Sequence, residues 1–419
     1  MYENVKGKKL LILGGGSDMV EVTKLAQSMG CTVYVMDYYD TLRSPAKLVA
    51  DQYSDISIAD YDLVVGYIKA NGIDGVITGY TDSYLEHYLN ICELAGLPHY
   101  GNEKSFGIAA NKMLFKNACR EAGVGIIPGT NAYDFETVEQ FAEKNGYPLI
   151  LKPVDNSGSR GVIKCEEASD LRRCYDYALS FSYSDNVIVE RFMDCDSVVC
   201  SYQFDGKTAR LSALCDREIY KAAQDGSAIT REALYPSKYL DRFIAEQDSA
   251  MKSLFEQNDF SDGMLGVMGF VDDESFYWCE MTYRPSAGHH YTFINDQNGI
   301  NGLALFIEFA VTGRVCSYES EKESPYFKEY LGMVHILGCA NKKIASIKGV
   351  DTIAALPYVL EVCSELRIGQ TTGKDGTTAQ TLLSVWLKGK DFIEYSERVD
   401  YIKSVFEVYD EDGEMIVIK

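Results

Sequence analysis

A short apolar run that ends in a lysine and opens into a loop of small residues carries the strongest chemical signal in the sequence. Residues 149–151 form the run, Lys152 ends it, and the loop consists of Asn156, Ser157, Gly158, Ser159, Arg160 and Gly161. Successive backbone N–H groups in such a loop make a concave site for anions. Lys152 adds a point charge, and Arg160 a planar fork of donors, for phosphate oxygens. The pattern predicts a phosphate-binding site; the alternative is a hairpin turn with a surface lysine.

An acid at the end of the next apolar run suits a nucleotide base. Residues 187–189 are apolar and Glu190 follows them, so its carboxylate is expected at a strand end beside exposed backbone groups. Such an acceptor suits the amino edge of adenine, and Asp196, six residues later, suits the ribose hydroxyls. Because charged side chains are mostly exposed, the alternative for Glu190 is a solvated strand end.

Within residues 276–284, three polar side chains occupy every second position from Glu280 onward. A strand turns every second residue to the same face, which places Glu280, Thr282 and Arg284 together. The carboxylate and the hydroxyl offer the oxygen ligands that Mg²⁺ prefers, and the guanidinium suits a reacting phosphate. The alternative is a cross-strand ion pair, which is common on protein surfaces.

A triple glycine after the first apolar run is a weaker candidate for a binding loop. Residues 14–16 are all glycine, and Asp37 stands where a dinucleotide-binding loop would have its ribose-binding acid. The third glycine of that fingerprint falls on Met19, so the motif is broken. We therefore expect a plain strand-to-helix turn, with a dinucleotide-dependent oxidoreductase as the alternative.

The elements that must position these residues alternate at first between strand and helix. Apolar spacing predicts strands at 10–13, 33–35 and 76–77 and helices at 19–29, 63–71 and from 82 to about 96. Asp82 is expected to cap the last of these helices. Strands that alternate with helices form a parallel sheet, so the first part of the chain is predicted to be a Rossmann-like α/β domain.

From Asn111 onward, strand signals dominate. One helix follows Asn111, with Lys112 and Lys116 on one face and an apolar face of Leu114, Phe115, Ala118, Cys119 and Ala122. Further strands are predicted at 149–152, 162–164, 187–190, 198–204, 211–215, 265–271, 276–280 and 415–418, and a polar helix at 242–257.

In this order, the Lys112 helix, the Lys152 strand and loop, the Glu190 strand and the Glu280 strand resemble the ATP-grasp superfamily. The branch that they resemble contains biotin carboxylase and carbamoyl phosphate synthase, and the ATP-dependent amino-acid ligases are similar too. The resemblance covers about residues 1–310, and the tail at 338–349 is similar to the C-terminal domain of that branch.

The resemblance implies ATP and Mg²⁺ as cofactors and assigns a role to each motif. Lys112 and Lys152 would contact the ATP phosphates under the cover of the loop 157–161, and Glu190 with its following backbone would hold adenine. Glu280 would bind Mg²⁺, and Arg284 would face an acyl phosphate. The implied chemistry is phosphorylation of a carboxylate by ATP, followed by attack of an amine.

The chain departs from the family pattern at two metal-binding positions. The family has Glu-x-Asn-x-Arg, and here Thr282 takes the asparagine position. A first metal carboxylate is expected about a dozen residues earlier, where this chain has Met268, whose soft sulfur is a poor ligand for Mg²⁺. The alternative to a ligase is therefore a non-catalytic ATP-binding homologue that lacks one metal site.

The loop after Arg284 is where an anionic substrate would bind. It reads Pro-Ser-Ala-Gly-His289-His290, unlike the acidic stretch that the biotin carboxylase branch has near its bicarbonate site. We expect Arg217, His289 and His290 to meet the substrate there, with Arg217 and Arg284 as catalytic cations. The alternative for each histidine is a structural or surface role.

These expectations combine into an α/β protein of three parts. The predicted domains are a Rossmann-like domain at 1–105, an ATP-grasp domain at 106–315 with a lid lobe at about 115–190, and a small α+β domain at 316–419. The predicted function is an ATP-dependent ligase for a small-molecule carboxylate and a small-molecule amine. A homodimer is a further expectation.

Composition restricts the partners and the location. The 419 residues carry a net charge of −22, which disfavours nucleic acid and anionic membranes as partners. Twelve cysteines are scattered without zinc spacing, and the first apolar run is too short for a signal sequence. A reducing cytoplasm is therefore expected.

Overall fold

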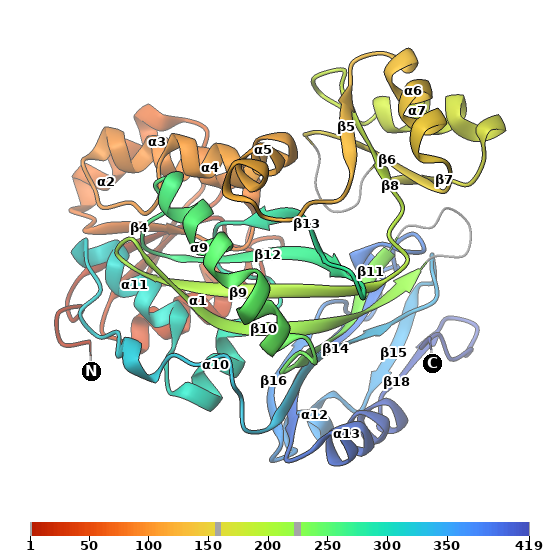
Figure 1. Cartoon of the computed structure of the whole chain (residues 1–419). Helices are drawn as coiled ribbons and strands as arrows, with labels where there is room; N and C mark the ends of the chain where they lie inside the picture. The colour runs from red at the N-terminus through yellow and green to blue at the C-terminus, as the bar shows by residue number, and fades with distance from the viewer. Residues whose placement is uncertain (1, 156–160, 222–227, 419) are drawn as a thin grey trace.

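The computed structural model describes residues 2–155, 161–221 and 228–418. Five predicted phosphate-binding residues, Asn156, Ser157, Gly158, Ser159 and Arg160, lie outside this part of the chain. Figure 1 shows an N-terminal unit in red and orange, a projecting lobe in yellow, and a large central sheet that continues from green into blue. The α/β class predicted from the sequence is confirmed.

The N-terminal unit is built on a parallel sheet with the strand order β3-β2-β1-β4. Its strands are β1 (Lys9–Leu13), β2 (Thr32–Met36), β3 (Gln52–Ser54) and β4 (Gly75–Thr78), and its helices are α1 (Met19–Ser28), α2 (Tyr61–Asn71) and α3 (Leu85–Ala95). The side chains of residues 10–13 are fully buried, as expected for a parallel strand with both faces covered. The predicted Rossmann-like alternation is therefore present.

The helices in this unit follow the sequence signals, except at one residue of a predicted apolar face and at one predicted cap. Gly72 and Gly96 take the left-handed conformation that ends α2 and α3. Leu63, predicted on the apolar stripe, is exposed. The predicted cap at Asp82 is wrong, because this carboxylate binds the guanidinium of Arg284 and does not accept from the helix N-terminus.

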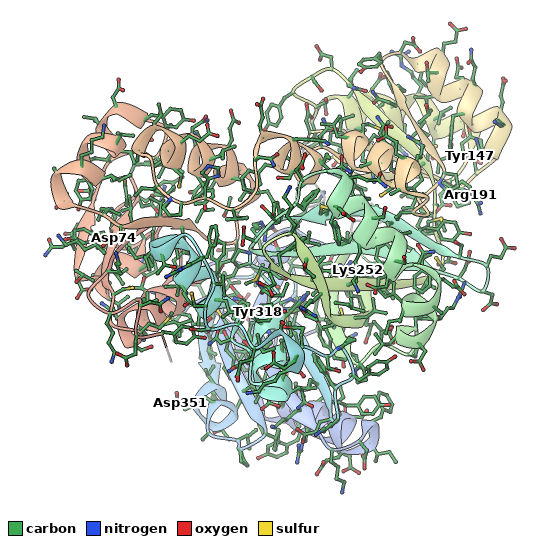
Figure 2. The ribbon with its side chains drawn as sticks, turned by 60° about the vertical axis from the view of Figure 1, so that its left-hand side comes forward. Asp74, Tyr147, Arg191, Lys252, Tyr318 and Asp351 are labelled. Atoms are coloured by element: carbon green, nitrogen blue, oxygen red, sulfur yellow. The ribbon has the colours of Figure 1, made fainter. Side chains whose placement is uncertain are left out.

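The projecting lobe is a small antiparallel sheet with two helices on it. The strand order is β5-β8-β6-β7, and the elements are β5 (Gly129–Ala132), β6 (Leu149–Pro153), β7 (Ile163–Cys165), β8 (Val187–Arg191), α6 (Phe135–Asn145) and α7 (Leu171–Leu179). Tyr147 and Arg191, labelled in Figure 2, mark this lobe at the opposite side of the molecule from Asp74 of the N-terminal unit. The lobe has a hydrophobic core of its own.

The central sheet has the order β13-β12-β9-β10-β11-β14-β17-β16. Its strands are β9 (Asp196–Asp205), β10 (Thr208–Lys221), β11 (Ala228–Tyr235), β12 (Met264–Val271), β13 (Phe276–Thr282), β14 (Tyr330–Leu337), β16 (Val359–Ser364) and β17 (Thr381–Gly389). The pairing of β11 with β14 carries the sheet across the predicted boundary at residue 315. The three-domain division stays a prediction.

The remaining helices cover this sheet and join it to the N-terminal unit. They are α4 (Glu103–Ala110), α5 (Lys112–Ala122), α8 (Leu240–Glu246), α9 (Asp248–Gln257), α10 (His290–Asn298), α11 (Gly302–Thr312), α12 (Val350–Ala354) and α13 (Phe392–Val405). Residues 302–311 of α11 are buried on every side, because this helix packs against β1 and β4 while facing the larger core. The two units therefore share one hydrophobic core.

Two sequence expectations in the second half of the chain are wrong in detail. The helix predicted at 242–257 is two helices, because the backbone leaves the helical conformation at Gln247. Residues 415–418 form only isolated bridges, whereas β15 (Ile344–Lys348) pairs with β18 (Glu407–Asp410). Among the residues described, no helix has the length and apolar character needed to cross a membrane.

Replacing Gly75 with alanine is expected to destabilise the protein. A Cβ at this position in β4 would overlap the backbone carbonyl of Ala310 in α11, and such overpacking costs roughly 1–3 kcal/mol. Gly66→Ala is the matched control, because Gly66 lies within α2 with open space around it and alanine favours a helix by about 1 kcal/mol. Urea unfolding should lower the midpoint for Gly75→Ala and raise it for Gly66→Ala. Equal midpoints would contradict the close packing of α11 on β4.

Candidate active site

A cavity of about 1900 Å³ lies where the lobe, the central sheet and the N-terminal unit meet. Residues from all three line it. The predicted site residues among them are Lys112, Lys152, Glu190, Asp196, Arg217, Glu280, Thr282, His289 and His290. The fold thus brings together most of the described side chains that were selected from the sequence.

Three buried charges form the most constrained part of this cavity. The Glu190 carboxylate on β8 pairs with Lys152 on the neighbouring strand β6 at 2.7 Å, and it also pairs with Lys116 of α5. The Glu190 side chain is 3% exposed and that of Lys116 is fully buried. The pairs fix the Lys152 ammonium group at the cavity, and two lysines against one carboxylate leave a surplus of positive charge there.

Burial and pairing act in opposite directions on these groups. Burial alone would raise the pKa of Glu190, but the charges of Lys152 and Lys116 outweigh it and lower that pKa. At Lys152, burial is likewise outweighed by Glu190, and the pKa is raised. Burial prevails at Lys116 and lowers its pKa. The Lys152–Glu190 pair is therefore charged over the whole physiological range.

The geometry gives Glu190 a different neighbourhood from the one expected. Its carboxylate is paired with two lysines, whereas an adenine contact was expected. The following residues Arg191 and Phe192 also line the cavity, and their backbone N–H groups donate to the carbonyls of Pro128 and Pro148. Lys116 was missed as a site residue. It lies one helical turn after Lys112, and that spacing was the available signal for a shared face.

A second group of polar side chains faces the cavity from β13. Glu280 and Thr282 both line it, and the pKa of Lys112 is lowered by burial, with the charge of Glu280 opposing that shift. Met268 on β12 is paired in register with Glu280, and Arg217 contacts its sulfur. A thioether and a guanidinium therefore stand where a further carboxylate was expected.

Two predicted residues are held by ion pairs at the edges of the site. Asp196 binds Lys238 at 2.7 Å and the hydroxyl of Tyr239 at 2.6 Å, and it still lines the cavity. Arg284 makes two bonds of 2.7 Å to Asp82 and borders a separate cavity of about 30 Å³. Arg284 is not among the residues that line the large cavity, so the structure does not bring it to the lysines.

The two histidines differ in their surroundings. The Nδ1 atom of His289 lies 2.7 Å from Glu361, a residue 72 positions later in the chain. His290 faces the hydroxyl of Ser201 at 2.8 Å, and burial, with repulsion from His289 and Arg217, lowers its pKa to about 4. His290 is therefore neutral at physiological pH, whereas His289 has a carboxylate partner.

The triple glycine forms a closed turn. The buried carboxylate of Asp37 accepts from the N–H of Gly15 at 2.8 Å and from the hydroxyl of Ser44 at 2.5 Å. A Cβ at Gly14 would meet the ring of Tyr84. Asp37 is thus used inside the turn, which favours the plain strand-to-helix reading over dinucleotide binding.

One residue of the predicted phosphate loop is described. Gly161 has φ +78°, and a Cβ there would overlap Phe181. Only glycine adopts this conformation at that distance without strain. The end of the loop is therefore fixed against the lobe.

Comparisons with known proteins relate part of this chain to a described family. Residues 111–257 match the family described as "Carbamoyl-phosphate synthase L chain, ATP binding domain". A formate-dependent phosphoribosylglycinamide formyltransferase from Bacillus velezensis is 26% identical over 297 residues, which is 68% of this chain and 72% of that protein.

Two solved structures show the same fold over nearly the whole chain. An L-amino acid ligase from Bacillus licheniformis has a TM-score of 0.80 at 14% identity and covers 97% of this chain and 99% of its own. The biotin carboxylase domain of the Hydrogenobacter thermophilus 2-oxoglutarate carboxylase, solved with MgADP and bicarbonate, has a TM-score of 0.77 at 17% identity, with coverages of 98% and 91%. The resemblance predicted from the sequence is confirmed. The chain has the fold of these ATP-grasp proteins, and residues 111–257 are similar to the ATP-binding domain of the carbamoyl-phosphate synthase L chain.

Proposed function

We propose that this protein is an ATP-dependent ligase that joins a small-molecule carboxylate to an amine through an acyl phosphate. The observation that carries the proposal is the convergence of Lys112, Lys152 and Glu280 on one cavity. Cations at fixed positions stabilise the charge that develops on a transferred phosphoryl group. The relatives support it, because the similar proteins include a formyltransferase and an amino acid ligase.

The described residues fit ATP and Mg²⁺. The cavity is large enough for a nucleotide and a second substrate, and its lysines supply local positive charge against the net charge of −22. Lys112 and Lys152 would hold the phosphates, and Glu280 with Thr282 would hold Mg²⁺ through oxygen atoms. When bound, the metal polarises phosphoryl oxygens and neutralises their charge.

The other predicted residues keep proposed roles of orientation. Asp196, Arg217 and His290 line the same cavity. Asp196 is proposed to accept from a sugar hydroxyl, and Arg217 and His290 are proposed to orient the carboxylate. Arg284 is proposed to act only after it leaves Asp82, because the ion pair holds it outside the large cavity. We also propose a cytoplasmic location, which the twelve free thiols favour, and a homodimer.

ADP release tests the proposal. We expect the purified protein to release ADP from ATP only when a carboxylate and an amine are both present, and to stop when EDTA removes Mg²⁺. A panel of amino acids, dipeptides and short carboxylic acids, offered singly and in pairs, is measured by a coupled ADP assay. ATP binding without turnover across the panel would favour the second candidate, a non-catalytic homologue, for which Met268 at a metal position is the specific observation.

A further inference from the structure

The large cavity has an acidic border as well as a basic one. Asp18, His289 and Glu365 line it together with the lysines, and they come from three distant segments. Asp18 precedes α1, His289 precedes α10, and Glu365 follows β16. None of these segments carries the residues to which a phosphate-binding role is assigned above.

His289 is held in a single orientation within this border. It is 4% exposed, and its Nδ1 lies 2.7 Å from Oε1 of Glu361 and 3.6 Å from Oε2 of Glu21. Its ring stacks on those of Tyr80, Tyr291 and Trp386 at centroid distances of 5.2, 5.2 and 4.9 Å. Among the described residues, none forms a hydrogen bond with Nε2, and the ring lines the large cavity, so this nitrogen is available to a ligand there.

The carboxylates around His289 exceed the nearby positive charge. They are Asp18, Glu21, Glu361 and Glu365, and in the described part of the chain no lysine or arginine forms an ion pair with any of them. Their hydrogen-bond donors include the neutral hydroxyls of Tyr291, Thr292 and Ser384. Burial first, and then mutual repulsion, raises the pKa of Asp18, Glu21 and Glu365. Such a site favours a cationic ligand.

The spacing of the ligand atoms favours an organic cation over a metal ion. Two atoms that share one zinc ion at bonds of about 2.0–2.1 Å lie roughly 3.3 Å apart in a tetrahedral site. Nδ1 of His289 and Oε1 of Glu361 are at the shorter distance of a charge-assisted hydrogen bond. Glu361 therefore holds the Nδ1 proton, and Nε2 remains the atom that can accept a proton.

Building on the proposed function, we propose that this border is the acceptor subsite and that the amine enters it as an ammonium ion. The carboxylates hold the cation, and Nε2 of His289 takes one of its protons, which frees the nitrogen lone pair. The C–N bond then forms as the bond between the acyl carbon and the phosphate oxygen breaks. Phosphate leaves with that electron pair and with a second proton from the nitrogen.

The charge on His289 follows from its neighbours. Burial by itself would lower the His289 pKa, but the hydrogen bond and charge of Glu361 outweigh burial, and the pKa is raised. An ammonium ion bound beside the ring would lower the pKa again, because like charges repel. The titratable and polar groups that face the ring are Asp18, Glu21, Tyr80, His290, Tyr291, His335, Glu361, Glu365 and Trp386.

The test follows the titration of His289 in the intact protein. Its imidazole resonance is assigned by its loss in His289→Gln, and its pKa is measured with and without glycinamide, L-alaninamide or methylammonium. The N-acetyl derivatives of the two amides are the uncharged comparisons. We expect the amines to lower the His289 pKa and the acetylated compounds to leave it unchanged. Glu361→Gln should lower the pKa without any ligand and weaken amine binding by about tenfold, the loss for one hydrogen bond to a charged group.

Glu411→Gln is the matched control, because Glu411 is exposed and its partner is Lys343. It should leave both the titration and amine binding unchanged. The proposal is overturned if the amines leave the His289 pKa unmoved, or if the acetylated compounds act equally. It is also overturned if Zn²⁺ binds one to one and Glu361→Gln abolishes that binding. MgATP affinity is measured on the same samples. If MgATP binds and the amine tests fail, only the acceptor subsite is excluded. If MgATP does not bind, the proposed function fails.

Discussion

Replacing Glu190 with glutamine should lower the free energy of unfolding by about 3–5 kcal/mol, the cost of leaving buried charges without their partner. The variant keeps the size of the side chain and removes only its charge. Lys116 is fully buried, so water cannot replace the lost carboxylate at its ammonium group, and Lys152, which is 8% exposed, borders the cavity. Urea unfolding at neutral pH, followed by circular dichroism, measures the change.

The same lobe supplies the control for this prediction. Glu166→Gln removes an ion pair of 2.8 Å to Lys164, but the Glu166 side chain is 62% exposed, so the loss should be about 0–1 kcal/mol. The double variant Glu190→Gln, Lys116→Met should regain part of the stability, because it removes one of the two stranded charges. A loss of less than 1 kcal/mol for Glu190→Gln alone would contradict the buried triad.

The pH dependence of this stabilisation has a definite sign. Because the pKa of Glu190 is lowered in the folded state, its contribution is fully present above the unfolded value of about 4.3 and is lost as the pH falls below it. Wild type and Glu190→Gln should therefore converge in stability in acid. A constant difference between them down to acidic pH would show that the effect is steric.

Most strands near the site could be predicted because the apolar residues of a buried strand are adjacent in the sequence. Continuous apolar runs gave β1, β6, β8 and β12 to within two residues, since strands covered on both faces need apolar side chains throughout. The helix break at Gln247 has no such signal. Neither does β11, whose alternating polar residues pair with β14 about a hundred positions later. The spacing of apolar residues indicates which side chains are buried, and it does not indicate which strands pair with each other.

The site was predictable as a set of motifs and not as a network of charges. Lys152 and Glu190 lie at the ends of apolar runs, and each run predicted a polar group at the end of a strand. Their mutual pairing, and the pairing of Arg284 with Asp82, depend on contacts across 38 and 202 positions. Glu361 has no motif around it at all. A single sequence shows which groups are charged, whereas the fold decides which of them neutralise one another.

Replacing Lys152 with methionine should weaken MgATP binding by about ten- to a hundredfold. The lysine makes the cavity positive at a point that Glu190 fixes, and hydrogen bonds to charged groups contribute roughly 1.5–3 kcal/mol each. Methionine keeps the length of the side chain, and Glu190 keeps Lys116 as its partner, so the fold should survive. Calorimetric titration with MgATP measures the affinity directly and needs no knowledge of the other substrates.

The control for this variant separates local from general electrostatics. Lys144→Met removes the same charge from the exposed end of α6 in the same lobe and should change the affinity less than twofold, because salt screens exposed charges over about 10 Å. If both variants weaken binding equally, ATP is attracted by the net charge of the lobe and Lys152 makes no contact with it. If Lys152→Met alone binds weakly while its melting temperature is unchanged, the ammonium group fixed by Glu190 is the phosphate contact, and the buried triad acts to hold that one cation in place.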